Sequence, residues 1–224
     1  MFDEYVLIQK VLSAVLVGYL LGSIPFARTA ARLRGVDIFS TGSHMAGTAN
    51  VFWNIGRWTG TLVFVGDVAK GSAAVVIAGL LEVPAPLILL VAAAAIFGHW
   101  MSVFARFRGG DGMAPLMGVT LAMEPALALL GIAAGFAVIL LLSHRPLRSS
   151  WGIICCFAVM LTLSLYYQVD RGLVVGLTSL AGLVLIRSTL VRRRRTRRAG
   201  AGVALPLSAI DPEPDLGPPA PESP

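Results

Sequence analysis

The sequence predicts an all-α protein, a polytopic integral membrane helix bundle with about seven spans. Of its 224 residues, 56% are hydrophobic and only 13% are charged, and the mean hydropathy is +0.79. A soluble domain of this length needs far more charge on its surface. The chain also contains several apolar runs that approach the roughly 20 residues of a membrane-spanning helix. Lipid is therefore the expected solvent for most of the chain.

The order of the apolar segments, and of the charges between them, predicts the number of spans. Arginines follow the first, third, fifth and last segments, whereas Glu82, Glu124 and Asp170 follow the others. Only an odd number of spans places every arginine cluster in the cytoplasm, with the N-terminus outside and the C-terminus inside. We therefore expect a multi-pass membrane protein, with its polar loops and C-terminal tail in the cytoplasm. The expected spans are Val6–Ala27, Thr59–Leu81, Ala85–Ala105, Met113–Met123, Pro125–Ser143, Trp151–Gln168 and Gly172–Val191.

The composition changes near the C-terminal end of the chain. The segment from Arg192 to Arg198 contains six arginines, a pattern typical of a cytoplasmic stop signal that contacts anionic lipid headgroups. No aromatic or folded segment accompanies this run, so a nucleic-acid partner is not expected. The sequence beyond it is rich in proline and acidic residues and cannot form a core. We expect a transmembrane domain over residues 1–198 and a disordered cytoplasmic tail over residues 199–224.

Two polar, glycine-rich loops interrupt the apolar segments, at residues 41–50 and 108–112. Because glycine has no Cβ, the backbone N–H groups of such loops can approach an anion such as phosphate. The first loop also carries hydrogen-bonding side chains, among them Ser43, His44 and Asn50. Adjacent residues tend to point apart, so Ser43 and His44 do not indicate a serine-hydrolase pair. A flexible connector is the alternative interpretation of this loop.

Asp67 and Lys70 lie three residues apart within the second expected span, on one face of a helix. Charged side chains are costly inside a membrane, so both should face the protein interior and pair with each other or with a polar cavity. A structural ion pair is the expected role of Asp67. Lys70 lies near several glycines and serves either packing or the binding of an anion.

The second glycine loop precedes an expected helix that begins at Met113. A glycine loop at this position exposes N–H groups and the positive end of the helix dipole, which together favour an anion. Arg106 and Arg108 add positive charge. Asp111 opposes this interpretation, because an acid at a helix start satisfies the dipole and repels an incoming anion. A capped helix start is therefore the alternative.

The order and spacing of these motifs resemble one known family over about residues 18–118. The matching residues are Gly22-Ser23-Ile24-Pro25-Phe26; Gly42-Ser43, Gly47 and Asn50-Val51; Asp67, Lys70 and Gly71; and Gly98-His99, Val103-Phe104, Phe107, Gly109-Gly110 and Gly112. This pattern resembles the bacterial acyl-phosphate:glycerol-3-phosphate acyltransferases, the PlsY family.

The resemblance implies a membrane enzyme of phospholipid biosynthesis. Such an enzyme moves a fatty acyl group from acyl-phosphate to the 1-hydroxyl of glycerol 3-phosphate, giving lysophosphatidic acid, with no metal and no cofactor. The resemblance implies Ser43 and Asn50 as catalytic residues that position the substrate, without a covalent serine intermediate. The residues expected to bind substrate are Gly42, Gly47, Lys70, His99, Arg108, Gly109, Gly110 and Gly112.

Several positions depart from the family's motifs. Trp53 stands where the family has an arginine, and Asp111 stands where it has a lysine. The histidine and asparagine that the family carries after its last span have no counterpart around residues 187–198. Three alternatives therefore stay open: a relative without activity that binds lipid or a partner, an acyltransferase with a neutral or cationic acceptor, and a small transporter.

Overall fold

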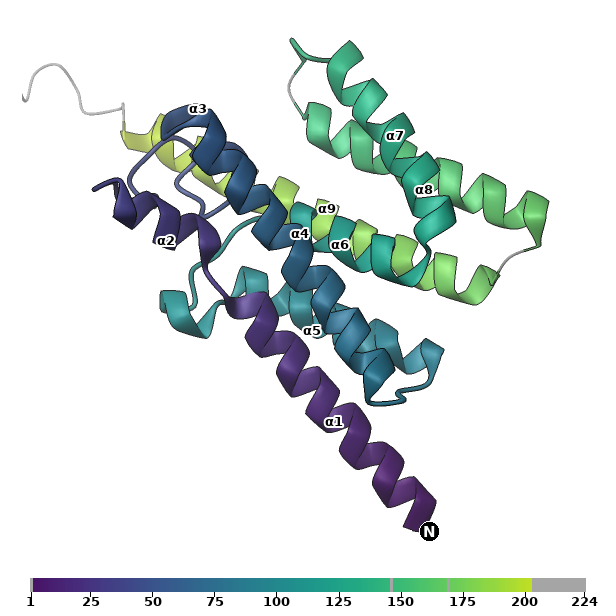
Figure 1. The fold of residues 1–224 in the computed structure, drawn as a ribbon. Coiled ribbons are helices and arrows are strands. Elements are labelled where there is room, and N and C mark those ends of the chain that lie inside the picture. Colours follow the sequence, from purple (N-terminus) through teal and green to yellow (C-terminus); the bar gives the residue numbers. More distant parts are fainter. Residues whose placement is uncertain (1, 146, 169, 203–224) are drawn as a thin grey trace, which may run out of the picture. The chain divides into compact units, whose positions relative to one another are not determined.

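The regular structure of this chain is helical wherever the structure describes it. The computed structural model describes residues 2–145, 147–168 and 170–202, and no strand occurs within these ranges (Figure 1). The helices are α1 (Phe2–Ser23), α2 (Phe26–Leu33), α3 (Thr48–Asn54), α4 (Arg57–Leu80), α5 (Ala85–Trp100), the single 3₁₀ turn η1 (Val103–Ala105), α6 (Met113–Met123), α7 (Pro125–Leu141), α8 (Arg148–Tyr167) and α9 (Arg171–Gly202).

Each of the seven predicted apolar segments coincides with a helix. Within the described ranges, five helical segments are long and apolar enough to cross a membrane. Two shorter apolar helices, α6 and α7, complete the set, and α6 has the predicted bounds. The predicted all-α membrane bundle is therefore confirmed. The number of helices that cross the membrane, and their orientation, stay predictions.

Two short helices were not expected from the sequence. Helix α2 follows Pro25 and buries Ala27 and Ala31, one turn apart, while its arginines lie on the other faces. Helix α3 begins at Thr48, so the last three residues of the first glycine loop are helical. The period of apolar residues did not reveal either helix, because eight and seven residues are too few for a helical period to be recognised.

The chain divides into two compact units, residues 1–187 and residues 188–224, each of which is described by itself. In the second unit, the described residues 188–202 form the C-terminal part of α9. This helix continues through the arginine run and ends four residues beyond the expected domain boundary at residue 198. The expected disordered tail, from residue 203 onward, lies outside the described residues.

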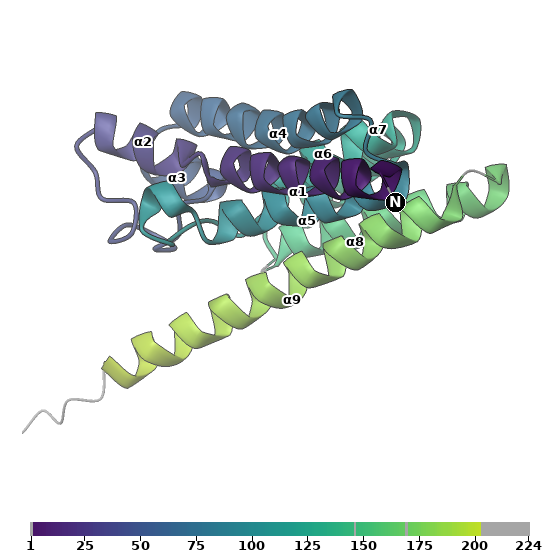
Figure 2. The ribbon, with the colours of Figure 1, turned by 90° about the horizontal axis from the view of Figure 1, so that it is seen from below.

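Glycines allow the helices of the first unit to pack closely. Helix α1 lies beside α4 and α5 in both ribbon views, and α4 lies beside α6 (Figures 1 and 2). A Cβ at Gly22 would collide with the backbone of Ala95, and a Cβ at Gly118 would collide with the backbone of Val68. Small residues at such positions are the usual way in which membrane helices approach each other. The Gly22-Ser23 motif thus serves helix packing.

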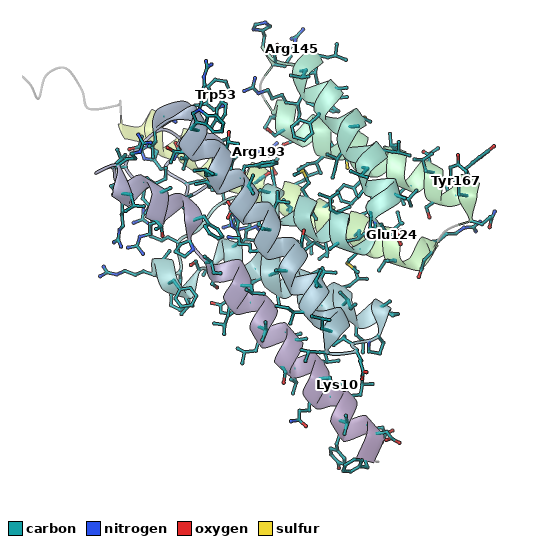
Figure 3. The ribbon with its side chains drawn as sticks, viewed as in Figure 1. Lys10, Trp53, Glu124, Arg145, Tyr167 and Arg193 are labelled. Carbon is teal, nitrogen blue, oxygen red and sulfur yellow. The ribbon has the colours of Figure 1, made fainter. Side chains whose placement is uncertain are left out.

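The arginine-bearing segments meet at one end of the first unit. Arg28 of α2 donates a hydrogen bond to the carbonyl oxygen of Phe104, at 3.0 Å. The guanidinium of Arg148, at the start of α8, lies 5.6 Å from the ring centre of Trp53 on α3. Figure 3 shows Arg145 at the same end of the α7–α8 pair. The arginines that follow the first, third and fifth apolar segments therefore gather at one end of the first unit.

Acidic residues mark the opposite end, where Figure 3 shows Glu124 and Tyr167. Lys10 of α1 donates a 2.5 Å hydrogen bond to Glu82, and this bond lowers the pKa of Glu82. Partial burial raises the pKa of Glu124, and the neighbouring Asp170 carboxylate raises it further. The same separation of basic and acidic residues in the sequence was the basis for predicting which loops lie on which side of the membrane.

Candidate active site

Three charged or titratable side chains form a buried cluster between α4 and α5. We use the name "buried cluster" for Asp67, Lys70 and His99, which are 1%, 4% and 5% exposed. The Lys70 Nζ atom lies 2.8 Å from Asp67 Oδ1, and His99 Nδ1 lies 3.6 Å from the same oxygen. Lys70 also donates a hydrogen bond to the carbonyl oxygen of Ile24, at 2.9 Å. The predicted pairing of Asp67 with Lys70 is thus confirmed, and the lysine charge is taken up by protein groups.

The second glycine loop packs directly on the buried cluster. The backbone N–H of Gly110 donates to the carbonyl oxygen of His99, at 3.2 Å. A Cβ at Gly109 would collide with the His99 backbone, and a Cβ at Gly110 would collide with the His99 ring. Gly112 has a φ of +91°, a conformation that glycine adopts without strain. Close approach to α5 and a left-handed turn therefore account for these three glycines.

Two side chains hold this second loop in place from outside it. The Trp100 indole N–H donates to the carbonyl oxygen of Asp111, at 2.8 Å. Arg187 of α9 donates to the carbonyl oxygen of Gly110, also at 2.8 Å, with its guanidinium 4.8 Å from the Trp100 ring centre. The Asp111 carboxylate accepts a hydrogen bond from the backbone N–H of Met113, at 3.2 Å. This hydrogen bond agrees with the alternative interpretation of the loop, in which Asp111 caps the start of α6.

Asn50 organises the first glycine loop. Its side-chain amide donates to the carbonyl oxygens of Ile38, Thr41 and Met45, at 3.2, 2.9 and 2.9 Å. Its side-chain oxygen accepts from the backbone N–H of Ser43, at 3.3 Å. Asn50 is 3% exposed, so these contacts hold the loop from within. Asn50 is thus placed as a positioning residue for the segment that carries Ser43.

Ser43 itself lies on the exposed surface of this loop. Its neighbours adopt left-handed conformations, with φ of +55° at Gly42 and +54° at His44. A Cβ at Gly42 would collide with the side chains of Asn50 and Asn54, whereas a Cβ at Gly47 would meet no atom within 4 Å. The two glycines therefore differ: Gly42 permits a tight turn, and Gly47 borders open space.

A cavity of about 310 Å³ extends from the buried cluster along α6, α7 and α8. We call it the acyl groove. At one end it is lined by the polar side chains of Thr48, Asp67, His99 and Asp111. Thr48 Oγ1 contacts Asp67 Oδ2 at 3.5 Å. The remaining lining is largely apolar and includes Phe64, Met113, Ala114, Met117, Ile132, Phe136, Ile139, Ile153, Cys156 and Phe157. An apolar slot with one polar end suits an amphipathic molecule.

Arg148 supplies a cation to the acyl groove that the sequence analysis did not assign to the site. It lies at the start of α8, lines the groove and faces the ring of Trp53. Its guanidinium also donates to the carbonyl oxygen of Ser143, at 2.8 Å. In the sequence, Arg148 is one of the arginines after the fifth apolar segment and indicates only orientation, because no motif shows that the start of α8 lies near α3.

The structure brings only part of the predicted site to the groove. Of the predicted residues, His99 lines the groove directly. Each glycine loop contributes a neighbouring residue to the lining, Thr48 from the first loop and Asp111 from the second. Arg108 does not line the groove; its guanidinium lies 3.9 Å from the ring centre of Phe39, and it lines a small separate pocket together with Lys70, His99 and Gly109. Lys70 is held by Asp67 and Ile24, away from the groove lining. No group of three or more potential metal ligands occurs among the described residues.

The comparisons with known proteins agree with this arrangement. The profile of the family described as Glycerol-3-phosphate acyltransferase matches residues 12–197. The chain belongs to this family. It is similar to a glycerol-3-phosphate acyltransferase of Geobacter sulfurreducens, with 34% identity over 181 residues, 81% of this chain and 91% of the relative. It is 40% identical over 149 residues to one of Thermus thermophilus, covering 66% of this chain and 75% of the relative.

Solved structures of the family share the fold. The chain superposes with a TM-score of 0.69 and 28% identity on PlsY, an integral membrane glycerol 3-phosphate acyltransferase, in its glycerol 3-phosphate form. A second PlsY structure, in its lysophosphatidic acid form, gives a TM-score of 0.67. Each alignment covers 86% of this chain and 92% of PlsY. The resemblance found in the sequence is therefore confirmed, and so is membership of a family of multi-pass membrane proteins.

Proposed function

We propose that this protein transfers a fatty acyl group from acyl-phosphate to a hydroxyl of glycerol 3-phosphate. The observation that carries the proposal is the acyl groove, whose polar end adjoins the glycine loops and whose walls are apolar. Family membership supports the same reaction. The PlsY forms with glycerol 3-phosphate and with lysophosphatidic acid correspond to its acceptor and its product.

The reaction balances without a metal or a cofactor. The acceptor hydroxyl oxygen bonds to the acyl carbon, the bond between that carbon and the phosphate oxygen breaks, and phosphate leaves. The hydroxyl proton ends on the released phosphate or in water. Donors placed around the carbonyl stabilise the negative charge that develops on its oxygen. In this account Ser43 contacts substrate, and Asn50 positions the loop that presents it.

The acyl chain occupies the apolar part of the acyl groove. Helices α6, α7 and α8 provide its walls, and Phe136, which is 45% exposed, leaves the groove open to its surroundings. Because lipid surrounds these helices, van der Waals contact with the apolar walls, and not exclusion of water, favours the chain in the groove. A long acyl chain is thereby held while its phosphate end stays at the polar end of the groove.

Arg148 binds a substrate phosphate at the polar end. The guanidinium of arginine matches phosphate with two parallel hydrogen bonds. Trp53 stands where the family motif has an arginine, and Arg148 carries its positive charge against that same tryptophan. The cation that residue 53 lacks is thus supplied from α8.

The protein lies in the bacterial plasma membrane with its glycine loops toward the cytoplasm. The gathering of arginines at one end of the first unit, and of acidic residues at the other, supports this orientation. The arginine run at residues 192–198, in the C-terminal part of α9, contacts anionic lipid headgroups.

A direct assay tests the proposal. The purified full-length protein in lipid nanodiscs is incubated with palmitoyl phosphate and labelled glycerol 3-phosphate, and lysophosphatidic acid is separated by chromatography. The native protein is expected to form this product, and Ser43→Ala is expected to abolish it. Ser40→Ala, on the same exposed loop, is the matched control and is expected to retain activity. Absence of product above background from well-folded native protein would contradict the proposal.

A second candidate function is lipid binding without acyl transfer. Asp111 lines the acyl groove, and an acid at this position repels phosphate. The variant that combines Trp53→Arg with Asp111→Lys separates the two functions. If the native protein is inactive and this variant forms lysophosphatidic acid, the native protein is the non-catalytic relative. If the native protein is active, acyl transfer is its function.

A further inference from the structure

A second cavity lies apart from the acyl groove, at the arginine-bearing end of the first unit. Its volume is about 420 Å³, and it shares no lining residue with the acyl groove. Among the described residues, its lining holds four arginines and one acidic side chain. We call it the arginine cavity. Its lining residues are Arg28, Arg32, Gly35, Val36, Asp37, Ile38, Phe39, Ala105, Arg106 and Arg108.

Two of the four arginines are fixed by packing against the walls of the arginine cavity. Arg28 donates to the carbonyl oxygen of Phe104, at 3.0 Å, and Arg108 stacks on the ring of Phe39. These contacts use a neutral carbonyl and an aromatic face, and neither neutralises a guanidinium charge. The cavity therefore keeps a positive field from two rigidly placed cations.

The other two arginines, Arg32 and Arg106, also remain unneutralised. In the part of the chain that the structure describes, no ion pair joins any of the four cavity arginines to a carboxylate. The carboxylate of Asp37 accepts a hydrogen bond from the backbone N–H of Phe39, at 3.1 Å, and thereby forms the turn. One acid facing four guanidinium groups leaves a net positive cavity.

The backbone at Arg106 is strained in a way that brings this side chain to the cavity. Arg106 and Phe107 are consecutive non-glycine residues in the left-handed region, with φ of +55° and +58°. Hydrogen bonds from Phe107 N–H to the Ser102 oxygen, at 2.8 Å, and from Arg108 N–H to the Ala105 oxygen, at 3.2 Å, hold this turn. Such conformations are uncommon and concentrate at functional sites.

We propose that the arginine cavity binds a phosphate group at a site separate from acyl transfer. Like charges gathered around an open cavity repel one another, and a multiply charged anion between them removes that repulsion. Guanidinium groups are the side chains best matched to phosphate oxygens, through charge-assisted paired hydrogen bonds. The phosphate group belongs either to an anionic lipid headgroup or to a free phosphate.

Exposed apolar side chains beside the arginine cavity are compatible with the lipid source. Leu33, Phe104 and Phe107 are 83%, 56% and 58% exposed, and each adjoins a residue of the cavity lining in sequence. Apolar and aromatic side chains next to arginines are typical of a membrane interface, where headgroup phosphates lie. A lipid whose phosphate enters the cavity would place its chains against these residues.

Occupancy of the arginine cavity is coupled to the loop that carries Ser43. The wall residue Ile38 accepts a hydrogen bond from the Asn50 side chain, at 3.2 Å. The carbonyl oxygen of the wall residue Phe39 lies 3.1 Å from His44 Nδ1. A phosphate that orders residues 35–39 therefore also orders the first glycine loop. The site does not depend on acyl transfer, so it can be tested whether or not the protein is catalytic.

The test compares two double variants of the full-length protein that lose the same charge. Arg32→Gln with Arg106→Gln removes the two cavity arginines that make no packing contact described above. Arg34→Gln with Arg57→Gln removes two exposed arginines that line neither cavity. Thermal unfolding in neutral detergent is followed while inorganic phosphate or short-chain phosphatidic acid is titrated. Sodium chloride at equal ionic strength serves as the reference.

The native protein and the Arg34/Arg57 variant are expected to gain thermal stability as the phosphate compound is added. The Arg32/Arg106 variant is expected to need at least about tenfold more of it for the same gain. A response to phosphatidic acid alone identifies a lipid headgroup as the source, and an equal response to inorganic phosphate identifies free phosphate. If both variants respond as the native protein does to both compounds, or if none responds, the proposal is overturned.

Discussion

The buried cluster and the arginine cavity use charge in opposite ways. In the buried cluster, Lys70 and His99 lie 2.8 and 3.6 Å from Asp67 Oδ1, and all three side chains are almost fully excluded from solvent. In the arginine cavity, four cations face an open volume with a single acid among the described lining residues. The first arrangement holds helices together, and the second leaves charge available to a ligand.

This difference shows that a charged residue within a motif does not always contact a ligand. Lys70 is expected to bind substrate, and in the structure its charge is also met by Asp67 and the carbonyl of Ile24. Arg148, which belongs to none of the motifs, lines the acyl groove. Burial and partners, rather than position in a motif, separate structural charges from those that bind.

The largest expected effect comes from breaking the buried cluster. Lys70→Met leaves the Asp67 carboxylate buried without its cation, which costs about 3–5 kcal/mol of stability. The thermal unfolding midpoint of the purified variant in detergent should fall sharply. Lys70→Met combined with Asp67→Asn removes both charges and should recover part of the loss. A single variant as stable as the native protein would show that the cluster does not hold the helices.

A smaller effect is expected from filling the space between the second glycine loop and His99. Gly110→Ala pushes a methyl group into the His99 ring and should cost about 1–3 kcal/mol of stability. Gly47→Ala is the matched control, because its methyl group would enter open space, and should cost less than about 1 kcal/mol. Unfolding measurements on both variants check this order. Equal losses would contradict the packing role assigned to Gly110.

Arg148→Ala tests whether a cation that lines the acyl groove binds substrate, in contrast to the buried cations that hold helices together. Loss of a charge-assisted hydrogen bond of about 1.5–3 kcal/mol should raise the KM for a phosphate-bearing substrate by roughly tenfold or more, with stability unchanged. Arg145→Ala removes an exposed arginine that does not line the acyl groove and should leave KM unchanged. Steady-state kinetics of both variants decide the matter. An unchanged KM in Arg148→Ala would remove Arg148 from the site.

The smallest effect concerns Glu124, at the end of the first unit away from the arginines. Burial raises its pKa, so the folded protein holds this proton to higher pH than the unfolded chain does. Ionisation of Glu124 therefore lowers stability as pH rises. Glu124→Gln should be slightly more stable than the native protein near neutral pH. The difference should vanish at acidic pH, where both forms are neutral. Unfolding midpoints of both proteins, measured over a series of pH values, test whether ionisation of Glu124 lowers stability.

Most of the fold could be predicted because lipid imposes a simple pattern. A spanning segment must be long, apolar and helical, so composition alone identified all seven apolar helices, and α6 had the predicted bounds. The short helices α2 and α3 escaped prediction, since contacts made far along the chain fix them. Helix α3, for example, begins inside what was expected to be a loop.

The candidate site was predictable only in part. The glycine motifs indicated the family, and the three-residue spacing of Asp67 and Lys70 within a span indicated their pairing; both predictions are confirmed. The walls of the acyl groove and the approach of Arg148 to Trp53 depend on how α7 and α8 pack, which no motif encodes. The role assigned to Asn50 also changed, because the five residues that form hydrogen bonds with its side chain could be identified only from the structure. Those neighbours are Ile38, Thr41, Ser43, Met45 and Asn54.

The central claim, that the groove holds the acyl chain during transfer, is tested most directly by a pair of neighbouring substitutions on α8. Ile153 lines the acyl groove, whereas Ile154 does not and is 47% exposed. Lysophosphatidic acid formation from palmitoyl phosphate and from octanoyl phosphate is measured for Ile153→Trp and Ile154→Trp. The account predicts that Ile153→Trp selectively loses activity with the palmitoyl donor and that Ile154→Trp behaves as the native protein. Equal activity of both variants with both donors would contradict it.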